Sequence, residues 1–137
     1  MIMRDEIDEI IVNLVAIKEF SKDIHYTCHG EGFYGKHLLV EKFDWEESID
    51  LLKECCLLGN GDRPLSSKEY LEKASAILIE PDVSNDKLNF AKLANMLDKT
   101  LDKIDKVETD NRADSSILDN IAQDLQQYKG LVNLQLY

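Results

Sequence analysis

Residues that interrupt helices or crosslink chains are scarce: the 137-residue sequence contains two prolines, six glycines and three cysteines. Few prolines and glycines leave room for long helices, because these residues are the least stable in a helix interior. Cys55 and Cys56 are adjacent, so the three cysteines form a poor disulfide framework and suit a reducing compartment. They also lack the spacing of a cysteine metal site.

Basic residues are outnumbered as well, since 16 Lys and Arg against 27 Asp and Glu give a formal net charge of -11. Neither end carries a basic tail, which disfavours DNA binding because clustered Lys and Arg provide most nucleic-acid affinity. No apolar run approaches the roughly 20 residues of a membrane span, and the charged N-terminus lacks a signal-peptide core. We therefore expect a cytoplasmic protein, unattached to membranes, whose acidic surface attracts cations.

Hydrophobic residues make up 44% of the sequence, which is too many for a disordered chain and predicts one domain over residues 1–137. Apolar residues recur at helical spacing in four long segments. These predicted helices span residues 4–28, 33–58, 86–109 and 114–137. A capping-box pattern, Ser66-x-x-Glu69, predicts a short helix over residues 66–76. The expected fold is all-α: a four-helix bundle with a short extra helix between its second and third helices.

Chemically versatile residues gather at the end of the first predicted helix and the start of the second. All three histidines lie within thirteen residues there. His25 falls on the apolar stripe of the first helix, while His37, Glu41 and Asp44 share one side of the second. Buried imidazoles and carboxylates are costly unless they are paired or bind a metal. Such ligands suit iron, manganese or zinc. Iron is the predicted metal, because histidine and carboxylate ligands in bundle cores are typical of di-iron sites. A hydrogen-bonded core network is the alternative.

The same stretch resembles the Dps-like mini-ferritins, the DNA-protecting proteins of starved bacteria. In that family, a His ends the first helix, a Gly-containing turn follows, and a second His comes twelve residues on, with an acid four residues later. Here these positions hold His25, Gly30, His37 and Glu41 without a gap. Residues 66–75, SSKEYLEKAS, also resemble the family's short helix. The resemblance spans nearly the whole chain.

The resemblance implies a ferritin-like bundle that forms dimers and assembles into a hollow twelve-subunit shell. It also implies a ferroxidase site between two subunits, with His25, His37 and Glu41 from one subunit as iron ligands. An Asp and a Glu four residues apart on the second helix of the other subunit would complete it. Such sites oxidise Fe(II), often with hydrogen peroxide, and the ferric product is stored inside. The implied roles are iron storage and protection from oxidative stress, with DNA binding disfavoured here by the charge.

The second half of the ferroxidase motif departs from the family pattern. The nearest D-x-x-x-E pair is Asp50 and Glu54, which starts nine residues after Glu41, whereas the family has eleven. Without a gap, the expected positions hold Leu52 and Cys56. On a helical wheel, Asp50 and Glu54 lie on the solvent side.

Three explanations of this departure are open: the helix is locally rewound, the second half of the site is lost, or Asp44 substitutes within one subunit. The first and third keep an iron site, with Asp44, Asp50 and Glu54 as candidate completing ligands. The second predicts a Dps-like bundle that acts as a structural or interaction protein without ferroxidase activity. Ferroxidase chemistry at an altered site is the leading prediction.

Overall fold

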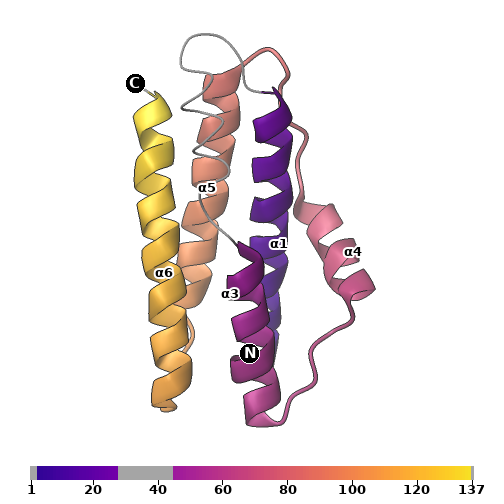
Figure 1. Ribbon diagram of the computed structural model, residues 1–137, viewed down its shortest axis with the longest axis vertical. Coiled ribbons are helices and arrows are strands. Elements are labelled where there is room, and N and C mark those ends of the chain that lie inside the picture. The colour runs from indigo at the N-terminus through magenta and orange to yellow at the C-terminus, as the bar shows by residue number, and fades with distance from the viewer. Residues whose placement is uncertain (1–2, 28–44, 137) are drawn as a thin grey trace.

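The computed structural model describes residues 3–27 and 45–136, which form helices joined by turns (Figure 1). In chain order these are α1 (Met3–Thr27), α3 (Trp45–Leu51), η1 (Leu52–Leu57), η2 (Leu58–Asn60), α4 (Ser67–Ile77), α5 (Asp86–Asp105), α6 (Arg112–Asn133) and η3 (Leu134–Leu136). The segment from α3 to η2 stands beside α1, α5 and α6 as a bundle, and α4 lies outside it against α1 (Figure 1). The predicted all-α four-helix bundle with an extra helix is confirmed. No helix in this part of the chain is long and apolar enough to cross a membrane.

Helix α1 contacts four other elements, α3, η1, α4 and α5. Its buried residues are therefore not confined to one stripe: the run from Ile10 to Ile17 is buried except for Asn13. Each fully buried Leu or Ile stabilises the fold by about 1.5–3 kcal/mol relative to an exposed one. This helix is consequently the centre of the described core.

Helices α5 and α6 each bury one stripe, as their apolar spacing predicts. The large apolar residues buried in these stripes are Phe90, Leu93, Leu97, Leu101 and Ile104 on α5, and Leu118, Ile121, Leu125, Tyr128 and Val132 on α6. Trp45 of α3 packs on Tyr128, with ring centroids 5.7 Å apart, and this contact joins α3 to α6.

The short helix α4 begins where the capping box predicts. Ser66 Oγ accepts a hydrogen bond from the Glu69 backbone N–H at 3.2 Å, and Glu69 Oε1 accepts one from the Ser66 backbone N–H at 3.4 Å. Two backbone donors that a helix start leaves without intrahelical partners are thus satisfied. Tyr70 then fastens the helix to α1, because its hydroxyl donates to Asp8 Oδ1 at 2.6 Å.

Helix α5 ends at Asp105, four residues before the predicted end at Thr109. The backbone N–H groups of Lys106 and Val107 donate three residues back along the chain, which tightens the last turn and stops the α-helix. Helix α6 begins at Arg112 because Asn111 Oδ1 accepts backbone hydrogen bonds from the second and third residues of the helix.

The second predicted helix is wound in three different ways where it is described. An α-helical turn, α3, passes into the π-helix η1 and then into the 3-10 helix η2. Gly61 closes the segment with a φ of 80°, a left-handed conformation that favours glycine. Residues 33–44 of this predicted helix lie outside the described residues. A π-turn holds more residues than an α-turn, so it changes which residues face the core.

Candidate metal site

His25 lies in the last turn of α1 and is partly buried. Its ring contacts the ring of Tyr26 edge-on, with centroids 4.9 Å apart and planes at 86°. Ile24 is fully buried and Tyr26 is 79% exposed, so His25 stands at the margin of the core between them. The helical wheel places His25 on the apolar stripe, and its Nδ1 atom is buried although the residue as a whole is partly exposed.

Lys18 joins α1 to α3 beside the candidate site. Its ammonium lies 2.6 Å from Glu46 Oε2, and this hydrogen bond lowers the pKa of the Glu46 carboxyl. The wheel places Lys18 on the same side of α1 as His25. On that side its ammonium must reach solvent or bind a partner. The pair therefore links α3 to α1 seven residues before His25.

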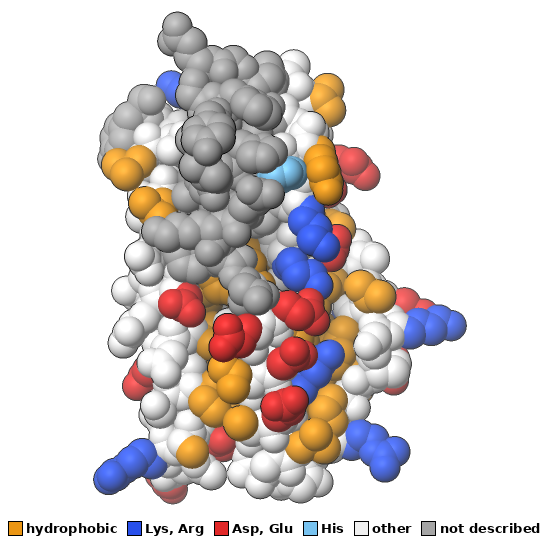
Figure 2. All heavy atoms as spheres, viewed as in Figure 1, with side chains coloured by type: hydrophobic (Ala, Val, Ile, Leu, Met, Phe, Trp, Pro, Cys, Tyr) orange, Lys and Arg blue, Asp and Glu red, His pale blue; other side chains and the backbone are white. Residues whose placement is uncertain are grey.

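Four carboxylates share the outer face of α3 and η1: Glu46, Glu47, Asp50 and Glu54. With Leu51 they line an open depression of about 390 Å³. Figure 2 shows acidic side chains gathered on this face of the molecule. Asp50 and Glu54 are exposed, as the helical wheel predicts. They are therefore accessible to a ligand or to another protein chain.

Leu52 and Cys56, which occupy the ungapped positions of the family's acid pair, face the opposite way. They are 0% and 2% exposed and belong to the hydrophobic core. A carboxylate at either position would enter the core, where an uncompensated charge is strongly destabilising. Asp50 and Glu54 are thus the D-x-x-x-E pair that this helix presents to solvent, and Glu54 already lies within the π-turn.

The structure describes three of the six predicted metal ligands: His25, Asp50 and Glu54. Within residues 3–27 and 45–136, no three His, Cys, Asp or Glu side chains are grouped as a metal site. His37, Glu41 and Asp44 lie outside the described residues. The two described parts of the candidate site are therefore the histidine at the end of α1 and the acid pair on α3 and η1.

A buried polar cluster that sequence reasoning missed lies beneath the π-helix. Asp114 is 2% exposed, and its Oδ2 accepts a hydrogen bond from Asn60 Nδ2 at 2.7 Å. The same amide nitrogen donates to the Cys56 carbonyl oxygen at 2.9 Å. Burial raises the pKa of the Cys56 thiol to about 12, and the nearby Asp114 carboxylate acts in the same direction. Cys56 is thereby kept as a protonated thiol, unsuited to metal ligation.

One sequence signal could have revealed this cluster. Asp114 is the third residue of α6, three positions after the Asn111 cap, where an acid is favoured by the helix dipole. Its partners, Asn60 on η2 and Cys56 on η1, are 54 and 58 residues away in the chain, and local patterns do not report such contacts.

No model of a known protein family matches the sequence, and no curated protein matches it. Solved structures do match over almost all of its length. One is the DPS protein from Vibrio cholerae O1, described as a member of a broad superfamily of ferritin-like diiron-carboxylate proteins. It is 17% identical, has a TM-score of 0.70, and the match covers 98% of this chain and 89% of that one. Antigen TpF1 from Treponema pallidum is also 17% identical, with a TM-score of 0.68 and coverages of 98% and 90%.

Proposed function

We propose that this ferritin-like bundle of the Dps type binds iron and oxidises Fe(II) with peroxide or oxygen. The proposal rests on the ferritin-like fold and the His25 motif occurring in the same chain. The chain matches a ferritin-like diiron-carboxylate protein over 98% of its length, and His25, the first residue of the motif, ends α1. Imidazole and carboxylate oxygen are ligands that suit iron.

The proposed ligands from one subunit are His25, His37 and Glu41. Two bound Fe(II) ions would each lose one electron, and one hydrogen peroxide would take both electrons with two protons to give two waters. The carboxylates of the site would offset the charge that iron gains on oxidation. The ferric product would then be stored, and consumption of peroxide would protect the cell from oxidative stress.

Asp50 and Glu54 are the proposed completing ligands, supplied by a second subunit. Their exposure on the outer face of α3 and η1 supports this role, whereas the burial of Leu52 and Cys56 argues against the ungapped positions. Asp44 is the alternative within the same subunit. Glu46 and Glu47 flank the pair, and together with the net charge of -11 they would raise the local concentration of Fe(II).

A homo-oligomer is part of the proposal, because a site shared between subunits is incomplete in one chain. A dimer is the smallest assembly that satisfies it, and a twelve-subunit shell is the assembly that the Dps resemblance implies. Leu51 and Leu58, 38% and 57% exposed beside the acid pair, give this face apolar area that a partner could cover. We place the protein in the cytoplasm, where the free thiols of Cys55 and Cys56 are stable.

The proposal is tested by adding Fe(II) anaerobically to metal-free protein, then peroxide, and following ferric absorbance per subunit. We expect rapid, saturable oxidation by the parent protein and only slow, unsaturable oxidation by His25→Ala/His37→Ala. Asp50→Asn/Glu54→Gln should be equally slow. Asp119→Asn/Asp124→Asn is the matched control, because it removes two charges from exposed positions of α6. Parent-like oxidation by Asp50→Asn/Glu54→Gln would instead assign the completing role to Asp44.

A second candidate function is a bundle that acts as a structural or interaction protein without ferroxidase activity. It is favoured by the apolar and thiol side chains at the two ungapped ligand positions, Leu52 and Cys56. In that case the parent and His25→Ala/His37→Ala would give identical slow traces in the same assay.

A further inference from the structure

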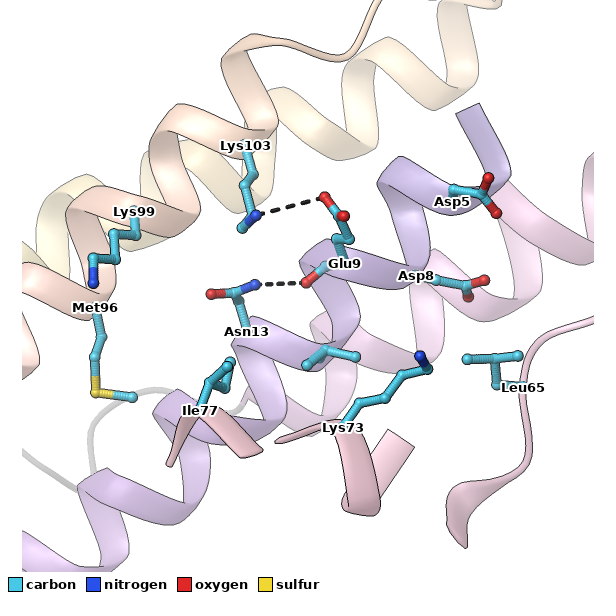
Figure 3. Close-up of a pocket in the computed structure, with 11 residues that line it drawn as sticks. Asp5, Asp8, Glu9, Asn13, Leu65, Lys73, Ile77, Met96, Lys99 and Lys103 are labelled. Atoms are coloured by element: carbon cyan, nitrogen blue, oxygen red, sulfur yellow. Dashed lines mark hydrogen bonds and ion pairs between the residues drawn. The ribbon is translucent and has the colours of Figure 1, made fainter. Parts of the chain in front are cut away.

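A groove separate from the candidate metal site runs between α1, α4 and α5 (Figure 3). Its volume of about 640 Å³ falls in the range of small-molecule sites. Four apolar side chains line it: Val12, Ile77 and Met96 from three different helices, and Leu65 from the segment before α4. Among the predicted metal ligands that the structure describes, none of His25, Asp50 and Glu54 lines this groove.

The carboxylates of the groove already have partners. Each of the three lies close to a cationic or hydroxyl group: Asp5 to Arg4 at 3.4 Å, Asp8 to the Tyr70 hydroxyl at 2.6 Å, and Glu9 to Lys103 at 3.5 Å. Figure 3 shows the last of these pairs above the groove. A cationic ligand would therefore have to compete with existing interactions.

Two lysines of the groove are differently placed. Among the residues that the structure describes, no carboxylate lies within 4.0 Å of the ammonium of Lys73 or Lys99. Lys73 still acts on Asp8, because its charge lowers the pKa of that carboxyl against the larger, raising effect of burial. Lys99 lies with Met96 at the end of the groove away from Asp5 and Asp8 (Figure 3). Its positive charge is the one that a ligand can best neutralise.

We propose that this groove binds an amphipathic organic anion, a monocarboxylate with a short alkyl chain. Its carboxylate would pair with Lys99, and its chain would cover Val12, Ile77 and Met96. The combination follows from the groove itself, which offers an ammonium at one end of an apolar floor. The protein's net charge of -11 repels anions in general, so retention of this one depends on local contacts.

The proposal makes a prediction about chain length. Each CH₂ group that becomes buried tightens binding by about fourfold at most, so affinity should rise from butanoate to hexanoate to octanoate. The rise should stop once the chain exceeds the apolar floor. Octyltrimethylammonium, which has the same chain and the opposite charge, should bind more weakly than octanoate.

The test is isothermal titration calorimetry of these probes into the full-length protein. We expect saturable binding of octanoate at one site per chain. Lys99→Gln should weaken it about two- to fivefold, as for an ion pair near the surface. Lys87→Gln is the matched control, because Lys87 is exposed on the same helix and lies outside the groove. Lys87→Gln should bind octanoate with the same affinity as the parent protein.

A second variant tests the apolar contact separately. Ile77 is 45% exposed, so Ile77→Ser should leave the fold intact while flattening the dependence of affinity on chain length. The proposal is overturned if octanoate shows no saturable binding, if the cationic probe binds equally well, or if Lys99→Gln and Lys87→Gln behave alike. Unchanged chain-length dependence in Ile77→Ser would overturn it too.

Discussion

The segment from α3 to η2 and the short helix α4 differ in what determines their shape. Helix α4 is regular, and its first turn is held by the reciprocal hydrogen bonds of Ser66 and Glu69. The α3–η2 segment passes through three windings, and the buried side chains of its π-turn η1 are Leu52, Cys56 and Leu57. Local hydrogen bonds thus set α4, whereas tertiary packing sets the winding of α3–η2. Because one side of α3–η2 packs against the core, the acidic side chains on its other side face solvent.

The largest expected effect distinguishes the two sides of this segment. Leu52→Asp restores an acid at the ungapped family position, and we expect it to lower the free energy of unfolding by about 4 kcal/mol or more, because the carboxylate enters the core. Leu51→Asp, one residue earlier and 38% exposed, should cost about 1 kcal/mol or less. Urea unfolding followed by circular dichroism measures both. Equal, small losses would mean that Leu52 does not face the core.

A smaller effect concerns the thiol beneath the π-turn. The pKa of Cys56 is about 12 in the folded protein, against 9.0 for an ordinary thiol. The folded state therefore holds this proton more tightly than the unfolded state. The contribution of this proton to the free energy of unfolding is fully present below pH 9 and is lost as pH rises toward 12.

Cys56→Ala should remove this pH dependence. Between pH 8 and pH 11, the free energy of unfolding of the parent should fall by about 2 kcal/mol more than that of Cys56→Ala. The partly exposed Cys55 provides the control Cys55→Ala, which should follow the parent. Parallel curves for the parent and Cys56→Ala would show that Asp114 and burial do not hold the proton on the thiol.

The smallest effect concerns the anchor of α4. Tyr70→Phe removes the hydroxyl that donates to Asp8 and accepts from the Leu65 backbone N–H at 3.1 Å. We expect a loss of about 1–2 kcal/mol in the free energy of unfolding, because the partly buried partners lose a hydrogen bond. Tyr26→Phe should change it very little, since Tyr26 is 79% exposed. If the two variants are equally stable, α4 is held by its apolar contacts alone.

Helix positions could be predicted well from the sequence because the relevant signals are local. The apolar spacing located α1, α5 and α6, and the capping box located the start of α4. The end of α5 was placed four residues late, because Val107 continues the apolar stripe although the helix has already tightened and stopped. Apolar spacing reports which side faces the core, and it does not report where the last α-turn closes.

The π-turn and the Asp114 cluster could not be predicted in the same way. A helical wheel assumes constant winding, whereas Leu52–Leu57 is wound as a π-helix. The contact between Asp114 and Asn60 joins residues 54 positions apart, which no local pattern encodes. For the candidate metal site, the exposure of Asp50 and Glu54 was predicted correctly, and His25, predicted on the apolar stripe, is partly buried. Ligation by any of these residues stays a prediction.

The proposed shared site is tested most directly by mixing two inactive variants. His25→Ala/His37→Ala retains the acid pair, and Asp50→Asn/Glu54→Gln retains the histidines. If the two halves come from different subunits, unfolding and refolding the variants together should restore about one quarter of the parent's ferroxidase sites. Half of the random dimers are then mixed, and each mixed dimer has one intact site. Recovery near that fraction is the predicted result, and no recovery in a folded, mixed oligomer would contradict a site shared between subunits.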